Sequence, residues 1–262
     1  MISIIMGVYN GAQTLAQAIE SILQQTFSDW EFIICDDCST DNTKEILSSY
    51  AEKDERFVII SNPQNMGLAA SLNHCLQYVK GEYIARMDCD DLSAPDRFEK
   101  QQAFLSQNPG FDLVGTYMQA FDTSGNLNVV EHKLLPTKYD VPKGAPFAHA
   151  TIMVKTSVLK ELNGYKISKH TMRTEDVDLW YRFFAAGYKG TSIPEPLYYV
   201  RMDDAAYKRR KLKYMLHASY IVWYGCGMLR LPFYYRIYCL KPILSWLLPR
   251  QAKISLRKWV IK

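Results

Sequence analysis

Three aspartates, Asp88, Asp90 and Asp91, lie within four residues and directly follow an apolar segment of the chain. Carboxylates this close together repel one another unless a cation or a proton relieves the repulsion. A hard divalent ion such as Mg2+ or Mn2+ prefers oxygen ligands and also binds phosphates. The alternative is a solvated acidic loop that caps a helix, because short D-x-D patterns often occur by chance. The place of this loop in the fold decides between the two.

The first half of the chain alternates short apolar runs with segments of helical spacing. The runs predict strands over residues 2–9, 31–35, 57–60 and 83–87, with helices after the first three, the third over residues 68–79. This alternation predicts a parallel sheet with right-handed crossovers. Such sheets bind ligands at the carboxyl ends of their strands. Tyr9-Asn10, Asp36-Asp37 and the acidic loop would converge there, which favours a ligand site.

Local patterns also predict where helices and turns begin. Thr14 and Gln17 form a capping-box pattern, and Ser93 is expected to be the N-cap of a helix that contains Pro95 in its first turn. Further along, residues 112–121 and 127–130 are expected to form a hairpin. Helices over 156–162 and 174–187, and a strand over 197–200, complete the prediction.

The ordered set of motifs resembles a family 2 glycosyltransferase of the GT-A fold. The segments that carry the resemblance are ISIIMGVYN from Ile2, SILQQTF from Ser21, DDCSTD from Asp36, RMDCDD from Arg86, PDR from Pro95, HAT from His149 and TEDVDLW from Thr174. They cover residues 1–202 in the expected order. The resemblance implies an α/β fold with a Rossmann-like, mostly parallel sheet flanked by helices. Residues 1–204 would form this domain, with a nucleotide-sugar-binding half (1–110) and an acceptor-side half (111–204).

The resemblance also implies the roles of single residues on the donor side. An aromatic ring and a carboxylate suit a uracil-type base as stacking face and as acceptor of a ring N–H. The implied nucleotide-sugar-binding residues are Val8, Tyr9, Asn10, Asp36, Asp37, Asn65, Gly67, Arg86, Asp88 and His149. The implied metal ligands for Mn2+ or Mg2+ are Asp90, Asp88 and Asp91, with Asp90 the first choice.

Several of these residues have a structural alternative. Asp36 and Asp37 could serve only the turn that leads to the next helix. Arg86 could form a salt bridge with a neighbouring aspartate, and His149 could be a satisfied structural histidine. Cys38 stands where the family turn has glycine, and a cysteine at positive φ would be strained. We therefore expect this turn to differ slightly from that of the family.

The resemblance implies an inverting transfer, which needs a general base to take a proton from the acceptor hydroxyl. The family places this base in its E-D motif, so Asp176 is the candidate and Glu175 the second choice. Both carboxylates could instead only complement the positive end of the following helix.

The last part of the chain differs in charge from the rest. Residues 205–262 hold 13 Lys and Arg, whereas all 27 Asp and Glu precede them. Aromatic residues are interspersed there, and the stretch 214–229 is shorter than the roughly 20 apolar residues that a spanning helix needs. We expect a basic helical extension that lies on an anionic membrane surface, with packing on the body as the alternative. A lipid-linked saccharide acceptor would meet the enzyme there.

The N-terminus has no basic segment ahead of its apolar residues, so we expect no signal peptide and a cytoplasmic protein at the inner face of the cell membrane. The predicted activity is transfer of a sugar from a UDP-sugar to a saccharide in bacterial surface polysaccharide synthesis. Two other functions stay open. A nucleotidyltransferase would also use aspartates and Mg2+, and a non-enzymatic binding module could bind nucleic acid through the basic extension. We expect no nucleic acid partner.

Overall fold

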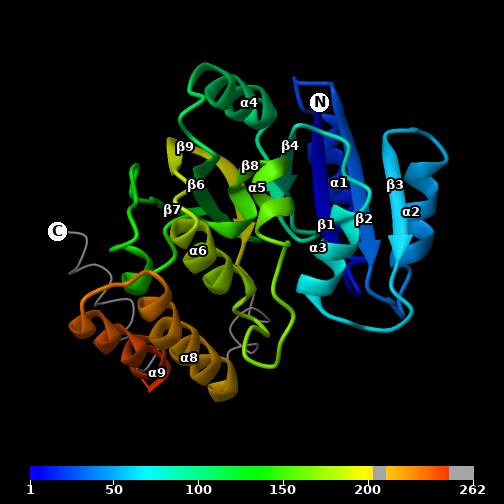
Figure 1. Ribbon diagram of the computed structural model, residues 1–262. Helices are drawn as coiled ribbons and strands as arrows, with labels where there is room; N and C mark the ends of the chain where they lie inside the picture. Colours follow the sequence, from blue (N-terminus) through cyan, green and yellow to red (C-terminus); the bar gives the residue numbers. More distant parts are fainter. Residues whose placement is uncertain (203–210, 248–262) are drawn as a thin grey trace.

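The computed structural model describes residues 1–202 and 211–247. One nine-stranded sheet runs through the described part of the chain, with helices on both of its faces (Figure 1). The strand order is β3-β2-β1-β4-β8-β6-β9-β5, and β7 pairs with β6. The sheet therefore joins the two halves of the chain through the neighbours β4 and β8.

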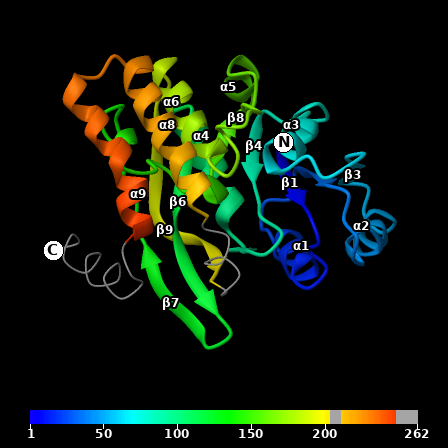
Figure 2. The same cartoon turned by 90° about the horizontal axis from the view of Figure 1, so that it is seen from below.

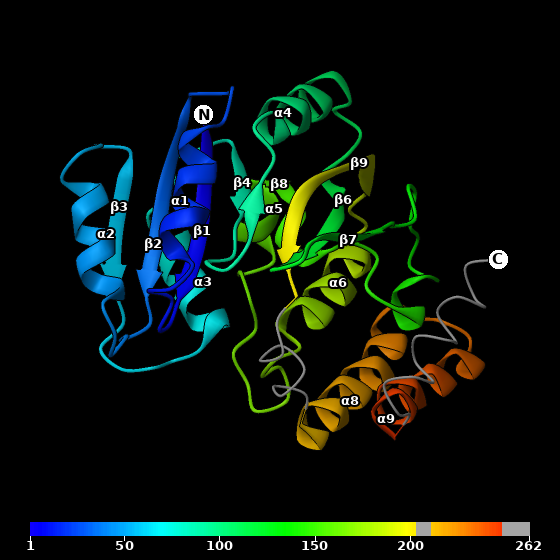
Figure 3. The same cartoon turned by 180° about the vertical axis from the view of Figure 1, so that it is seen from behind.

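The N-terminal half is a parallel α/β unit, as predicted. Its elements are β1 (Ile2–Val8), α1 (Leu15–Leu23), β2 (Trp30–Asp36), α2 (Thr43–Ala51), β3 (Phe57–Ser61), α3 (Leu68–Leu76) and β4 (Tyr83–Arg86). Side chains of β1 alternate between two cores: Ile4 packs with α1, whereas Ile5 packs with Leu72 of α3. Figure 3 shows α1 lying across one face of these strands. Burial on both faces explains why these strands are continuous apolar runs.

The second half adds strands of mixed direction. Its elements are β5 (Leu92–Ser93), α4 (Arg97–Gln107), β6 (Leu113–Asp122), β7 (Gly125–Val130), η1 (Val141–Lys143), η2 (His149–Thr151), β8 (Met153–Lys155), α5 (Thr156–Glu161), α6 (Glu175–Ala185) and β9 (Gly190–Arg201). The predicted hairpin is β6–β7, with Gly125 at φ 117° in its turn. Strand β9 is much longer than predicted and pairs in parallel with β6.

Two predicted helix starts are wrong in detail. Thr14 occupies the N-cap of α1 but its side chain makes no capping bond, and Gln17 instead accepts a bond from Arg201. Ser93 is not an N-cap, because it lies in β5, which pairs with β9, and α4 begins at Arg97 after the N-cap Asp96. Both corrections have one cause: a partner from the distant end of β9 takes the place of the local pattern.

The C-terminal helices lie against α6. They are α8 (Leu212–Met228), η3 (Phe233–Cys239) and α9 (Leu240–Leu247), and they form a layer beside α6 (Figure 2). α8 buries Ile221, Val222 and Cys226 in the core that contains α6. Within the described ranges, no helix is long and apolar enough to cross a membrane. The expected extension is thus helical where it is described, and one side packs on the body; residues 203–210 and 248–262 lie outside the described residues.

Candidate active site

The ends of β1 and β2 bring the first two predicted clusters together. Val8 and Asp36 are register partners in the parallel pair, and the N–H of Asp37 donates to the carbonyl of Val8 at 2.8 Å. The Asn10 side chain accepts a bond from the N–H of Thr40 at 2.8 Å, which ties the two loops to each other. Tyr9 follows on the surface with 48% of its area exposed. An exposed ring beside two buried carboxylates is an arrangement that can receive a flat base.

The two carboxylates have different surroundings. Both carboxylate oxygens of Asp37 accept hydrogen bonds from the protein itself. Oδ1 accepts from the Asn62 amide at 2.7 Å and from the Met66 N–H at 2.8 Å, and Oδ2 accepts from the Gly67 N–H at 2.8 Å. Asp36 accepts the Ser39 N–H through Oδ1 at 3.1 Å. The predicted turn chemistry is therefore present at both residues. Asp37 in particular orders the loop that presents Asn65 and Gly67.

Cys38 corrects one prediction. Its φ is 62°, so the turn has the left-handed conformation that glycine adopts freely, and it does not avoid that conformation. A cysteine there is strained by about 1 kcal/mol or more. Hydrogen bonds on its C-terminal side hold the turn: Ser39 Oγ accepts from the Asn10 N–H, and the Thr40 N–H donates to Asn10.

The acidic loop follows β4 at the same sheet edge. One carboxylate oxygen from each of Asp88, Asp90 and Asp91 lies within 4.8 Å of the others. Burial, and then the charges of Asp88 and Asp90, raise the pKa of Asp91 well above its usual value. This close set of hard oxygen donors carries a repulsion that a divalent cation would relieve, so the residues fit a Mg2+ or Mn2+ ion.

Strand β9 holds the acidic loop from the other side. The Arg201 N–H donates to Asp91 at 2.8 Å, and Arg201 Nε donates to the Asp90 carbonyl at 2.9 Å. The hydroxyl of Tyr198 accepts the Asp88 N–H at 3.1 Å. The sequence alone does not assign a role to Arg201 or Tyr198, because no local pattern links these residues to a loop about 110 positions earlier.

Arg86 lies at the centre of the site. Its guanidinium is buried and donates to both carboxylate oxygens of Asp88, so the predicted salt bridge is formed. Burial favours a lower pKa, but the charge of Asp88 raises the pKa of Arg86 above its usual value, so it stays charged. Burial raises the pKa of Glu175 and of Asp176, and the positive charge of Arg86 partly opposes this rise. Arg86 thus connects the acidic loop to the E-D motif electrostatically.

His149 is held by Tyr165. Its Nε2 lies 2.8 Å from the Tyr165 hydroxyl, and the backbone of Tyr165 exchanges two 2.7 Å hydrogen bonds with the Asn73 side chain. Burial and the charge of Arg86 keep the pKa of His149 well below its usual value, so the imidazole is neutral at pH 7. His149 therefore has the hydrogen bond of a structural histidine, which was the alternative interpretation. Any contact of its neutral ring with a sugar donor would be a hydrogen bond.

Glu175 and Asp176 open the first turn of α6, where negative charge complements the helix dipole. Burial is the largest influence on both and raises the pKa of each carboxyl. Asp178 is not a candidate base, because its carboxylate accepts a hydrogen bond from Arg182 Nε at 2.6 Å. A raised pKa brings a carboxylate closer to the basicity that proton transfer near neutral pH requires.

Comparison with known proteins agrees with this geometry. The family described as Glycosyl transferase family 2 matches residues 3–162. The chain belongs to glycosyl transferase family 2. It is 45% identical over 249 residues to the "Putative glycosyltransferase EpsE" of Bacillus subtilis (strain 168), which covers 95% of this chain and 90% of that protein.

A second relative is 28% identical over 222 residues, covering 85% of each protein: the "UDP-Glc:alpha-D-GlcNAc-diphosphoundecaprenol beta-1,3-glucosyltransferase WfaP" of Escherichia coli. Among solved structures, S. aureus TarS 1–349 in complex with UDP-GlcNAc superposes with a TM-score of 0.74 at 17% identity, over 96% of this chain and 77% of that one. This likeness confirms the predicted α/β GT-A fold. Family 2 membership makes the chain a glycosyltransferase that uses a nucleotide-sugar, and it argues against the nucleotidyltransferase and the non-enzymatic module.

Proposed function

We propose that this glycosyltransferase moves a sugar with inversion from a UDP-sugar to a hydroxyl of a lipid-linked saccharide in bacterial surface polysaccharide synthesis. The main support for the proposal is that Arg86 interacts with both the acidic loop and the E-D motif. The acidic loop is joined to this residue by hydrogen bonds, and the E-D motif lies within reach of its charge. A site for a charged leaving group and a candidate base are thus next to each other.

Donor binding is assigned to residues 1–110. Tyr9 would stack on the uracil and Asp36 would accept its ring N–H, beside Val8 and Asn10. Asp37 would act mainly by holding the loop of Asn65 and Gly67, because both of its oxygens bind its own chain. The relative named as a UDP-Glc transferase supports the choice of UDP.

The metal is assigned to the acidic loop. Asp90 and Asp91 would hold Mn2+ or Mg2+, with Asp88 as the third carboxylate. When bound, such an ion supplies positive charge that stabilises the diphosphate leaving group. Arg86 adds a fixed positive charge beside it, and His149 would contribute a neutral hydrogen bond to the same end of the donor.

Asp176 is assigned as the general base, with Glu175 as the second choice. Its carboxylate would take the proton of the acceptor hydroxyl while that oxygen bonds to the anomeric carbon. The bond from the anomeric carbon to the nucleoside diphosphate breaks on the opposite side, and the electron pair leaves with the diphosphate. Attack opposite to the leaving group inverts the configuration of that carbon.

Acceptor binding is assigned to residues 111–204, and membrane contact to residues 205–262. α8, η3 and α9 expose large apolar side chains, with Phe233 72% and Tyr234 68% exposed. Aromatic side chains among lysines and arginines suit the headgroup region of an anionic leaflet. The enzyme would then lie in the cytoplasm at the inner face of the cell membrane, with no nucleic acid partner.

The test is a panel of UDP- and GDP-sugars with Mn2+, each with lipid-linked saccharide acceptors. We expect metal-dependent nucleotide release with one UDP-sugar, and an NMR spectrum of the product that shows the anomeric configuration opposite to that of the donor. Absence of nucleotide release with every pair would count against the proposal, and a retained configuration would exclude Asp176 as an inverting base.

A further inference from the structure

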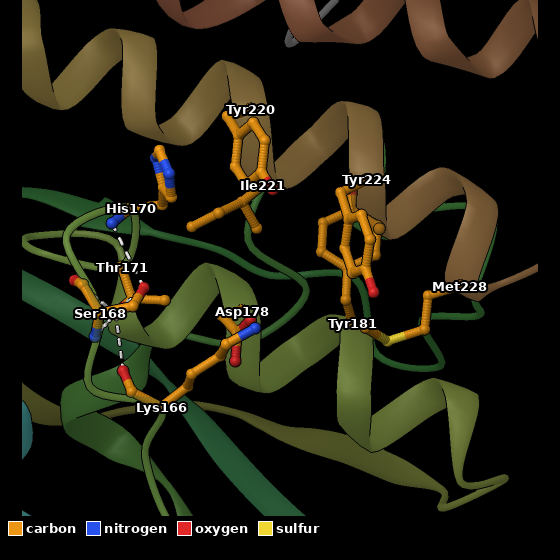
Figure 4. A pocket seen from close by; sticks show the side chains of 11 residues that line it. Lys166, Ser168, His170, Thr171, Asp178, Tyr181, Tyr220, Ile221, Tyr224 and Met228 are labelled. Atoms are coloured by element: carbon orange, nitrogen blue, oxygen red, sulfur yellow. Dashed lines mark hydrogen bonds between the residues drawn. The ribbon is translucent and has the colours of Figure 1, made fainter.

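A cavity of about 220 Å³ lies between α6, α8 and the loop of residues 166–171, outside the site described above (Figure 4). α8 can lie close to α6 because it carries Gly225: a Cβ there would meet the ring of Tyr181 at 2.4 Å. The cavity opens beside this contact. It is smaller than the roughly 300–1,000 Å³ pockets of drug-sized ligands, so it suits one small ring.

One wall of the cavity is aromatic. The rings of His170 and Tyr220 stack with centroids 4.3 Å apart, and Tyr224 lies parallel to Tyr220 at 6.3 Å. Tyr220 and Tyr224 are about half exposed, so part of their surface is open to a ligand. Figure 4 shows both tyrosines on α8 on the side that faces the loop. Such rings offer flat apolar surface with a polar edge at low entropic cost.

The opposite wall is polar. Lys166, Ser168, Thr171 and Asp178 line it, and Lys166 Nζ lies 6.0 Å from the ring centroid of Tyr224. Tyr181 also lines the cavity, and its buried hydroxyl forms a hydrogen bond with the Cys226 thiol. A flat apolar wall facing hydroxyl, ammonium and carboxylate groups matches a pyranose ring, which has C–H faces and a rim of hydroxyls.

The polar wall is built before a ligand arrives. The Thr171 hydroxyl donates to the Lys166 carbonyl at 2.7 Å and accepts the Ser168 N–H at 2.9 Å, which closes the loop on itself. The Thr174 N–H donates to the Thr171 carbonyl at 2.9 Å. The loop therefore leads without a break into the first turn of α6.

The cavity does not contain the proposed base, and helix α6 connects the two, since it carries both Asp176 and the cavity-lining Asp178. Its lining includes Thr171 and Asp178, which flank Asp176 in the chain. Asp176 and Asp178 are two positions apart and therefore face different sides of the helix. A chain of sugars whose end lies at Asp176 could place another of its rings in the cavity.

We propose that the cavity between the Tyr220–Tyr224 face and the 166–171 loop is a saccharide subsite that holds a non-reacting sugar residue of the acceptor. This inference rests on the proposed function, because it assumes a saccharide acceptor. Binding of a remote sugar would provide energy that orients the reacting hydroxyl toward the base.

The test is saturation-transfer NMR on the full chain with methyl glycosides of glucose, galactose and N-acetylglucosamine, with UDP and Mn2+ binding measured on the same samples. We expect at least one glycoside to bind. Tyr224→Ala should weaken this binding about tenfold, as expected for one lost stacking ring. Tyr224→Phe should keep it, and Tyr234→Ala, which removes an exposed tyrosine outside the cavity, should leave it unchanged.

Two outcomes overturn the subsite and leave the proposed function intact: no glycoside binds although UDP does, or a glycoside binds equally well to Tyr224→Ala. If glycoside binding depends on Tyr224 but UDP does not bind, the subsite stands as a saccharide site and the UDP-sugar donor is excluded. The two proposals can therefore fail separately.

Discussion

Arg86 donates to both carboxylate oxygens of Asp88, with Nη1 2.6 Å from Oδ2, and its side chain is only 5% exposed. Arg86 is the last residue of β4, and Asp88 lies in the acidic loop that follows it. A planar guanidinium matches a carboxylate in this two-bond geometry, whereas an ammonium group does not. Arg86 therefore positions Asp88 and supplies buried positive charge to the site.

Loss of the Arg86 guanidinium should lower the stability of the fold. Arg86→Met leaves Asp88, whose side chain is 27% exposed, without its partner, and we expect the free energy of unfolding to fall by about 1.5–3 kcal/mol, as for a lost charged hydrogen bond. Urea denaturation measures this change. Lys133→Gln, which removes the exposed partner of Asp140, is the control and should cost less than about 1 kcal/mol. Equal losses of unfolding free energy in Arg86→Met and Lys133→Gln would mean that the Arg86–Asp88 pair stabilises the fold no more than an exposed ion pair does.

Replacement of the proposed base should separate activity from stability. The raised pKa of Asp176 means that its ionised form is disfavoured in the folded protein. That penalty is present above the folded pKa and disappears as the pH falls through it. Asp176→Asn should therefore be more stable than the wild type at pH 8 and lose this advantage toward pH 4, as measured by thermal denaturation.

The same variant should lose about 10²–10⁴ in turnover, because a general base contributes roughly that factor. UDP binding, measured by calorimetry, should be nearly unchanged. Glu175→Gln is the matched comparison. If it loses more turnover than Asp176→Asn, the base is Glu175; if UDP affinity collapses in Asp176→Asn, the residue belongs to the donor site.

Metal dependence should trace to the acidic loop. A chelator should abolish nucleotide release, and Mn2+ or Mg2+ should restore it. We expect Asp90→Ala to raise the metal concentration for half-maximal activity by at least about tenfold. Asp29→Asn removes an exposed carboxylate that pairs with the N-terminus and serves as the control. An unchanged metal requirement in Asp90→Ala would remove this residue from the ligand set.

Asp36 and Asp37 should respond differently to substitution. Asp37 accepts three hydrogen bonds from its own chain, so Asp37→Ala should lower the free energy of unfolding by about 2–3 kcal/mol. Asp36→Ala should cost about 1 kcal/mol but weaken UDP binding roughly 10- to 150-fold, as expected for a lost charged hydrogen bond. The opposite pattern would assign the base contact to Asp37.

Membrane contact should depend on exposed apolar residues of η3. The triple change Phe233→Ser, Tyr234→Ser, Ile237→Ser removes side chains that are at least 66% exposed, so the fold should be kept. Binding to vesicles with phosphatidylglycerol should fall, and high salt should weaken binding of the wild type. Leu127→Ser, an exposed change on β7, is the control. Equal binding of the triple variant would place the membrane contact elsewhere.

The N-terminal α/β unit could be predicted from the sequence because its signals are local. Strands β1 to β4 are apolar runs, the first three each followed by a helix, and Tyr9, Asp36 and Asp88 lie at carboxyl ends of these strands. Parallel crossovers bring such ends to one edge, so the convergence of these residues follows from the pattern alone. The β6–β7 hairpin was predicted for the same reason.

The other side of the site depends on contacts between distant residues. Tyr198 and Arg201 reach the acidic loop because β9 extends to Arg201 and pairs with β5, which no local pattern reveals. That pairing also makes Ser93 a strand residue. Cys38 adopts a conformation that its residue type disfavours, because hydrogen bonds between Asn10 and the two residues that follow Cys38 hold the turn.

By itself, then, the sequence determined which carboxylates could do chemistry and at which edge of the sheet they lie, since side-chain type and period are local properties. Only the tertiary structure decided that burial raises the pKa of Asp176 while the charge of Arg86 opposes this rise, and that a cavity lies between α8 and the loop of residues 166–171. Charge and shape act through space, and Arg86 and Asp176 lie 90 positions apart along the chain.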